Sequence, residues 1–140
     1  MNKSDAKKLV QILKNTYPDA TCSLDFKTPF QLVVAVMLSA QCTDERVNKT
    51  TPILFERCKS IQDFADIDIT ELEKLIHPCG FYRNKAKNIK LCAKQVLENF
   101  NGIVPQTMDE LLSLAGVGRK SANVVLLEAF GIANGIAVDT

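Results

Sequence analysis

The chain has 140 residues, of which 46% are hydrophobic and 24% charged, and its formal net charge is +1. Such a composition is typical of a globular domain with one hydrophobic core. A net charge so close to zero argues against a basic tail or a broad polyanion-binding surface. Any nucleic-acid contact must therefore be local, made by a few side chains and by backbone N–H groups.

The sequence shows neither a membrane-spanning segment nor a secretion signal. No apolar run approaches the roughly 18 residues that cross a bilayer, and the first residues are charged rather than apolar. These features predict a cytoplasmic protein with no membrane partner. The five cysteines are widely spaced and form no C-x-x-C pair, so we expect buried reduced thiols rather than a zinc site or a disulfide framework: Cys22, Cys42, Cys58, Cys79 and Cys92.

The first half of the chain predicts a series of helices. An apolar face spaced at helical intervals favours a helix over 7–16. Thr28 can cap the next helix, Pro29 suits its first position, and Gln31 would complete a capping box. This helix, which runs through Leu38, is apolar nearly all round and should be central to the core.

A further helix should begin at Thr43 or Asp44, with Pro52 kinking or splitting it. Two short helices are then expected. Ser60 with Asp63 would cap the first, and Asp68 or Thr70 the second.

The second half continues in the same way. A long helix is expected from about Arg83 to Phe100, ended by Asn101-Gly102. Thr107 to Glu110 forms a second capping box, which opens a helix through Leu114. The last predicted helix carries Ala122, Val125, Leu126 and Ala129 and stops at Gly131. No alternating β pattern longer than a few residues occurs, so the predicted fold class is all-α.

The most informative segment is 111–122, L-L-S-L-A-G-V-G-R-K-S-A, which predicts helix, tight turn and helix. Gly116 and Gly118 permit positive φ and leave backbone N–H groups uncovered. The second helix would then start with free N–H donors and a positive dipole end, where a phosphate can bind. The alternative is a simple αα-hairpin turn in which the glycines serve only geometry.

The whole string resembles the helix-hairpin-helix motif of the endonuclease III family of DNA glycosylases, usually L-P-G-V-G-R-K-T-A. Ala115 stands where the family has proline, and Ser121 where it has threonine. Three further segments resemble the family in the same order along the chain: M-L-S-A-Q-C-T-D with V-N-K (37–49), G-F-Y-R-N-K-A (80–86), and N-V-V-L with I-A-V-D-T (123–140). Several motifs in the family's order make coincidence improbable.

The resemblance implies a six-helix glycosylase core over residues 22–131, with the helix-hairpin-helix at 111–130. Residues 1–21 would be the helix of a second domain whose C-terminal partner is absent. Residues 132–140 would be a truncated segment that carries the catalytic aspartate.

By this resemblance, the catalytic residues are Lys120 and Asp139. An uncharged lysine can attack C1′ of a damaged nucleotide, displace the base and form a Schiff base, and burial or a positive helix end favours the uncharged amine. Asp139 would assist deprotonation or stabilise positive charge on the sugar. The alternatives are a solvated lysine that contacts phosphate and an aspartate that caps the next helix.

The resemblance also assigns the DNA contacts. Gln41 would fill the space that the extruded nucleotide leaves, and Phe81 would wedge into the base stack, unless Phe81 is a core residue. The hairpin would contribute Gly116, Val117, Gly118, Arg119 and Ser121. For the basic repeat Arg83, Lys87, Lys90 and Lys94, a solvated face is favoured over a DNA track.

The function implied is base excision repair: a bifunctional glycosylase that removes oxidised pyrimidines and cleaves abasic sites by β-elimination. The partner would be damaged double-stranded DNA, bound by a bacterial monomer in the cytoplasm. A non-catalytic helix-hairpin-helix module that binds DNA backbone, or a glycosylase for other damaged bases, remains the alternative.

Two cofactors follow from the resemblance. Full-length family members carry a [4Fe–4S] cluster, whose four clustered cysteine ligands are absent from this chain. The family's hairpin can also bind a monovalent cation. Because the sequence ends one residue after Asp139, we expect a truncated chain of weak or no activity.

Overall fold

The structure, a computed structural model, describes residues 24–131. The helix predicted for 7–16, Cys22 and the segment with Asp139 lie outside these residues. The described part contains no strand, and the all-α prediction is confirmed. Its seven α-helices and one 3₁₀ turn are α2 (Pro29–Leu38), α3 (Asp44–Arg57), α4 (Ile61–Asp66), α5 (Ile69–Ile76), η1 (His77–Cys79), α6 (Tyr82–Asn99), α7 (Met108–Leu112) and α8 (Arg119–Phe130).

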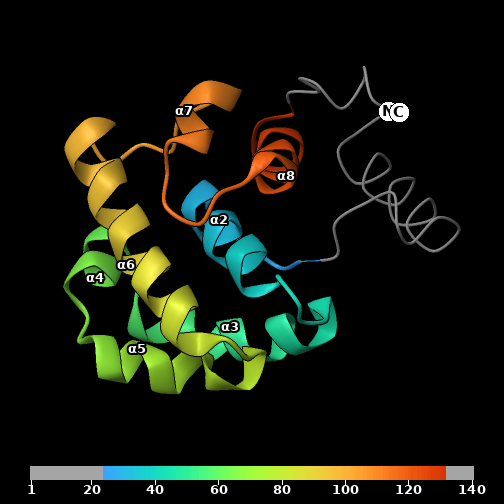
Figure 1. Cartoon of the computed structure of the whole chain (residues 1–140), viewed down its shortest axis with the longest axis vertical. Helices are drawn as coiled ribbons and strands as arrows, with labels where there is room; N and C mark the ends of the chain where they lie inside the picture. The colour runs from blue at the N-terminus through green and yellow to red at the C-terminus, as the bar shows by residue number, and fades with distance from the viewer. Residues whose placement is uncertain (1–23, 132–140) are drawn as a thin grey trace, which may run out of the picture.

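Helix α2 is central, between α6 and α8 (Figure 1). Every residue from Leu32 to Leu38 is buried, as its all-round apolar sequence predicts. Thr28 accepts the Gln31 N–H at 3.2 Å, which confirms the cap. Gln31 Oε1 accepts the Lys27 N–H at 2.8 Å, one residue earlier than a capping box requires. Gln31 thus bonds to Thr28 through its own N–H and to Lys27, the preceding residue, through its side chain, and both bonds stabilise the start of α2.

Helix α3 runs unbroken from Asp44 to Arg57 with Pro52 inside it. The alternative that Pro52 splits the helix is therefore wrong. Thr51 and Leu54 are buried on either side of the proline, so packing against the core continues across the residue that lacks an N–H. Tertiary burial offsets the missing hydrogen bond.

The two short helices begin where the sequence predicts. Ser60 and Asp63 form a full capping box at α4, and the Asp68 carboxylate accepts the N–H groups of Thr70 and Glu71 at α5. Phe64 in α4 is 2% exposed, and its ring centroid lies 5.4 Å from that of Phe30. These aromatic contacts fix α4 against the start of α2.

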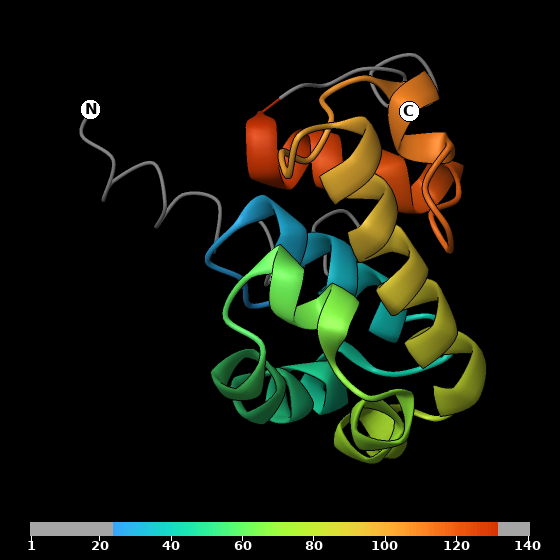
Figure 2. The same ribbon diagram turned by 90° about the vertical axis from the view of Figure 1, so that its left-hand side faces the viewer.

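Helix α6 is the longest element of the described chain and runs along one side of it, from the α7–α8 end to α5 (Figure 2). Its buried stripe packs against α4, α5 and α2. Lys90 does not belong to the expected solvated face, because its ammonium donates to the carbonyl oxygens of Ala65 and Ile67. Lys90 thus satisfies backbone carbonyl groups at the end of α4. The last turn of α4 contains no basic residue of its own.

Burial of Cys92 on α6 predicts a pH dependence of stability. Burial raises the pKa of this thiol from 9.0 to about 12, so the folded state keeps a proton that the unfolded chain loses above about pH 9. Stability contributed by this site is therefore lost as pH rises through that window. Between pH 8 and pH 10 the loss is about 1.4 kcal/mol.

The comparison that isolates this effect is with Cys92→Ala, which has no thiol at the site. Measured by urea unfolding, the stability advantage of the wild type over Cys92→Ala should shrink by that amount from pH 8 to pH 10. An advantage that stays constant over this range would show that Cys92 ionises normally in the folded chain.

Candidate functional site

The hairpin between α7 and α8 has one glycine with positive φ. Helix α7 ends at Leu112, two residues before the predicted end, and a turn follows in which the Val117 N–H donates to the Leu114 carbonyl at 3.2 Å. Gly116 lies in this turn with φ +76°. Gly118 has φ −97° and ψ −177°, an extended conformation open to any residue. Of the two hairpin glycines that permit positive φ, Gly116 adopts it and Gly118 does not.

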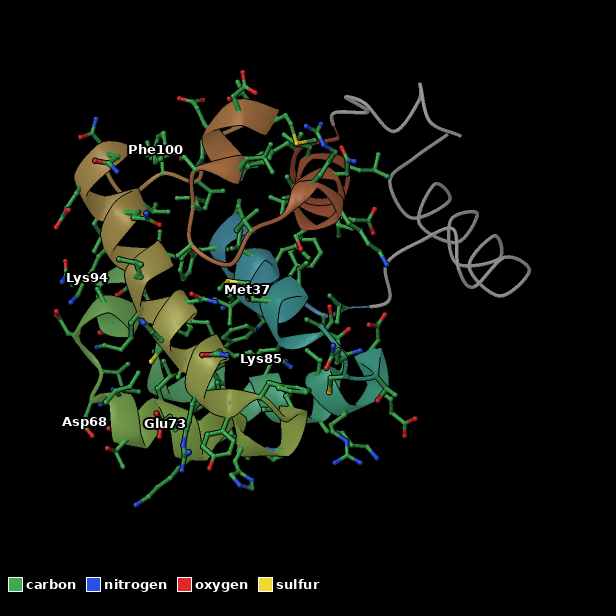
Figure 3. The ribbon with its side chains drawn as sticks, in the orientation of Figure 1. Met37, Asp68, Glu73, Lys85, Lys94 and Phe100 are labelled. Carbon is green, nitrogen blue, oxygen red and sulfur yellow. The ribbon has the colours of Figure 1, made fainter. Side chains whose placement is uncertain are left out.

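Gly116 is also required by close packing. A Cβ atom at this position would lie 2.6 Å from Met37 Cε and 3.0 Å from Asn88 Cβ. Figure 3 shows Met37 on α2 beneath the hairpin turn. The turn is held to α6 as well, since the Ala115 N–H donates to Gln95 Oε1 at 2.7 Å. The hairpin therefore rests directly on α2 and α6.

The N-terminus of α8 is open. Five helices of the described chain start with a side-chain cap, provided by Thr28, Thr43, Ser60, Asp68 and Thr107. The N-cap of α8 is Gly118, which has no side chain to accept a hydrogen bond from the first turn. The first-turn N–H groups and the helix dipole are thereby left for an external anion.

The hairpin residues differ in their exposure. Arg119 and Lys120 are exposed and Ser121 is half-buried. The burial expected for Lys120 is not found in the described chain, so its amine is open to solvent. The predicted DNA contact of Val117 stays a prediction; its side chain is buried in the core, 7% exposed, and its N–H is bonded within the turn. Its apolar side chain supports the hairpin from inside.

Gln41, predicted to fill the vacated space, and Phe81, predicted to wedge into the stack, are together named the wedge residues. They lie on separate loops and share an unusual backbone conformation. Gln41 follows α2 with φ +56°, and Phe81 precedes α6 with φ +48°. Both side chains are exposed, and Phe81 is 65% accessible despite its apolar ring. The core alternative for Phe81 is therefore wrong. Non-glycine residues with positive φ persist only where the surrounding structure holds them.

Lys85 is the residue that sequence reasoning missed. It is 7% exposed, and its ammonium donates to the carbonyl oxygens of Leu38 (2.9 Å), Ala40 (2.8 Å) and Cys79 (3.1 Å). Burial lowers the pKa of this lysine. A signal existed in the sequence, because Lys85 is in helical phase with the buried residues Ile89, Cys92 and Val96.

Two further findings bear on cofactors and membranes. Within residues 24–131, no group of three or more His, Cys, Asp or Glu side chains could hold a metal ion. Four cysteines of this range carry free thiols, and although Cys42 and Cys79 are neighbours, no three of the four gather at one place, so the range offers no set of ligands for an iron–sulfur cluster: Cys42, Cys58, Cys79 and Cys92. None of the helices between residues 24 and 131 is long and apolar enough to cross a bilayer.

The sequence and the fold match known proteins. A family model described as "HhH-GPD superfamily base excision DNA repair protein" matches residues 34–140. Endonuclease III of Synechocystis sp. is 58% identical over 138 residues, which are 99% of this chain and 63% of that protein. Endonuclease III of Escherichia coli is 41% identical over all 140 residues, 66% of its length. The chain thus spans about two thirds of these relatives.

A solved structure of a non-covalent endonuclease III–DNA complex superimposes with a TM-score of 0.80 at 44% identity. It covers 94% of this chain and 62% of the other. The family model covers the loops with Gln41 and Phe81 as well as the hairpin, which are the segments that carry the resemblance in the sequence. The chain therefore belongs to the HhH-GPD superfamily of base excision DNA repair proteins, and its predicted resemblance to endonuclease III is confirmed.

Proposed function

We propose that this chain carries the DNA-facing part of a bifunctional base excision repair enzyme, a DNA glycosylase and abasic-site lyase for oxidised pyrimidines. The observation that carries this proposal is the exposed Lys120 in the first turn of α8, behind an uncapped helix N-terminus. A lysine there can reach a sugar whose flanking phosphate binds the helix N-terminus. The similarity to a trapped covalent endonuclease III–DNA intermediate, with a TM-score of 0.79 at 44% identity, supports it.

In this proposal, the hairpin binds phosphate without a large basic surface. The first-turn N–H groups of α8 hold one phosphate, and the Arg119 side chain adds a local cation. The net charge of +1 for the chain agrees with such a localised contact. Ser121, half-buried at the third position of α8, adds a hydroxyl beside the same strand.

The chemical step uses the free amine of Lys120. Its Nζ forms a bond to C1′ as the C1′–base bond breaks, and the base leaves with a proton. The C1′–O4′ bond then breaks, the second Nζ proton passes to O4′, and a C1′=Nζ Schiff base results. Once this Schiff base is protonated, removal of a C2′ proton lets the C3′–O3′ bond break, and the 3′ phosphate leaves. Asp139 would assist deprotonation of Nζ or stabilise the charge on the sugar.

Bound DNA supplies the burial that Lys120 lacks. A nucleotide that leaves the stack and enters the site would cover the amine and exclude water from it. Gln41 would then occupy the vacated space in the duplex and Phe81 would wedge beside it, since both side chains project from their loops into solvent.

The same proposal includes a monovalent cation at the hairpin. Backbone carbonyl oxygens suit such an ion, and the Leu114 carbonyl accepts only the Val117 N–H in the described chain, which leaves one of its lone pairs free. In this proposal the protein would act as a cytoplasmic monomer on double-stranded DNA. The [4Fe–4S] cluster expected of longer family members enters no step.

Borohydride trapping tests the proposed function. The chain is incubated with a duplex that bears one abasic site, and borohydride reduces any Schiff base to a stable adduct. We expect an adduct with the wild type, because borohydride traps even a slow reaction, and a strongly reduced yield with Lys120→Ala. Arg119→Ala is the matched control, because it removes a neighbouring exposed cation but no nucleophile, and at saturating protein it should still form the adduct.

The opposite result is equally clear. Duplex binding without an adduct in the wild type would leave a non-catalytic helix-hairpin-helix module as the function of this chain. An adduct of undiminished yield with Lys120→Ala would assign the nucleophile to another amine.

A further inference from the structure

We propose that Lys85 is a positioning residue that holds the Gln41 loop and the Phe81 loop in one register, so that both side chains enter the same duplex site. This inference rests on the proposed function and deepens it. It starts from a geometric fact: a single buried ammonium is bonded to backbone carbonyls of both loops.

The three acceptors lie close to the wedge residues along the chain. The Leu38 carbonyl is at the end of α2, and the Ala40 carbonyl, 2.8 Å from Lys85 Nζ, belongs to the residue before Gln41. The Cys79 carbonyl, at 3.1 Å, lies two residues before Phe81. Lys85 therefore fixes the distance between two loops that are far apart in sequence (Figure 3).

An ammonium group suits this position because it has three N–H donors and no acceptor. Each donor is used by one carbonyl, and both ion pairs of the described chain involve other residues. A buried cation without a carboxylate partner is unfavourable unless carbonyl dipoles stabilise it. Separation of the two loops is therefore unfavourable, because each hydrogen bond lost to a carbonyl oxygen would leave the Lys85 ammonium less well solvated.

The two wedge residues need such support. Gln41 and Phe81 both have positive φ, a conformation that is strained for residues with a side chain. In exchange, the strained backbone directs both side chains outwards. Because each strained residue lies within two residues of a carbonyl held by Lys85, the lysine opposes relaxation of the backbone at both sites.

Helix α6 also relates these loops to the hairpin. Three turns beyond Lys85, Gln95 accepts the Ala115 N–H, and between them Asn88 lies under Gly116. The wedge loops and the phosphate-binding turn are thus anchored on one face of one helix. Lys85 therefore determines the position of the Gln41 and Phe81 side chains relative to the DNA strand bound at the hairpin.

Lys90 provides a matched control for a lysine whose role is purely structural. Lys90, on the same helix, also donates to two backbone carbonyls, those of Ala65 and Ile67. These carbonyls belong to the end of α4 and to Ile67 after it, away from both wedge loops. Lys85→Met and Lys90→Met should each lower stability, but only Lys85→Met should disturb the wedges.

The test measures the ratio of affinities for two duplexes, one with a tetrahydrofuran abasic analogue and one intact, of equal length and at equal salt. A 2-aminopurine opposite the analogue reports in parallel whether its stacking changes on binding. Phe81→Ala sets the signal expected when a wedge is lost. We expect Lys85→Met to reduce the ratio by roughly tenfold, as for loss of one stacked base, and to abolish the fluorescence change.

Affinity for the intact duplex should stay unchanged in Lys85→Met, because the hairpin alone binds it. Lys90→Met should keep the wild-type ratio. If Lys85→Met does not fold, as judged by circular dichroism, Lys85→Gln replaces it: its amide has two donors for three carbonyls, and the ratio should fall in the same direction.

Each contrary result overturns a different statement. A wild-type ratio with a folded Lys85 variant would show that the lysine has only a structural role. An equal fall with Lys90→Met would show that general destabilisation explains the effect. A wild type that does not distinguish the two duplexes would overturn the proposed function, and with it the role of Lys85.

Discussion

Gly116→Ala should strongly destabilise the chain, whereas Gly118→Ala, two residues away, should not. At Gly116 the new Cβ would meet φ +76° and approach Met37 Cε to 2.6 Å and Asn88 Cβ to 3.0 Å. Met37 Cε ends a flexible side chain and can move aside, so backbone strain at positive φ and crowding against Asn88 Cβ carry the effect, and we expect a loss of about 2 kcal/mol. Urea unfolding at neutral pH measures this loss.

Gly118 is the matched position. A Cβ there meets nothing within 4 Å, and its extended backbone is compatible with alanine. Stability should change by less than about 1 kcal/mol, because alanine restricts the unfolded chain but is a poorer N-cap residue than glycine. DNA affinity should fall nevertheless, because the methyl group would project where the phosphate backbone approaches the open helix end. Equal stability losses for the two variants would contradict the hairpin geometry.

Phe64→Ala should cause the largest loss of stability among core substitutions of the short helices. Its ring is 2% exposed and lies between Phe30, at 5.4 Å, and Phe55, at 6.2 Å. Truncation of such a phenylalanine costs about 3–5 kcal/mol, a large part of the free energy of unfolding of a small domain. Thermal unfolding monitored by circular dichroism would detect it.

Phe55→Ala is the control for Phe64→Ala. Phe55 is only half-buried at the edge of the same aromatic group, so fewer contacts are lost and the remaining space is open to solvent. Its loss of stability should be clearly smaller. A loss equal to that of Phe64→Ala would mean that the cluster is centred on Phe55 and that α4 is packed differently.

Local hydrogen bonds made much of the fold predictable. Thr28, Thr43 and Ser60 each bond a backbone N–H within three residues, so their roles as caps depend on nearby sequence alone. The positive φ of Gly131 likewise ends α8 where the sequence indicates. Helix starts and stops follow from such contacts, and most were predicted correctly.

The differences arise where distant segments meet. Pro52 remains inside a helix because the core on both sides of it is buried, and Lys90 turns inward because α4 presents free carbonyls. The sequence around Lys85 does not reveal that α2 and η1 end beside it, 47 and 6 residues away. The catalytic roles of Lys120 and Asp139 stay predictions, since they depend on bound DNA and on residues outside 24–131.

Mapping the trapped adduct tests the central claim, that Lys120 is the nucleophile, most directly. Abasic DNA reacts slowly with many amines, so the site of the cross-link is more informative than its yield. The reduced adduct is digested with trypsin, and the peptide bound to DNA is sequenced by mass spectrometry. Attachment at Lys120 Nζ is the expected result; attachment at Lys94, or at the α-amino group of Met1, would contradict it.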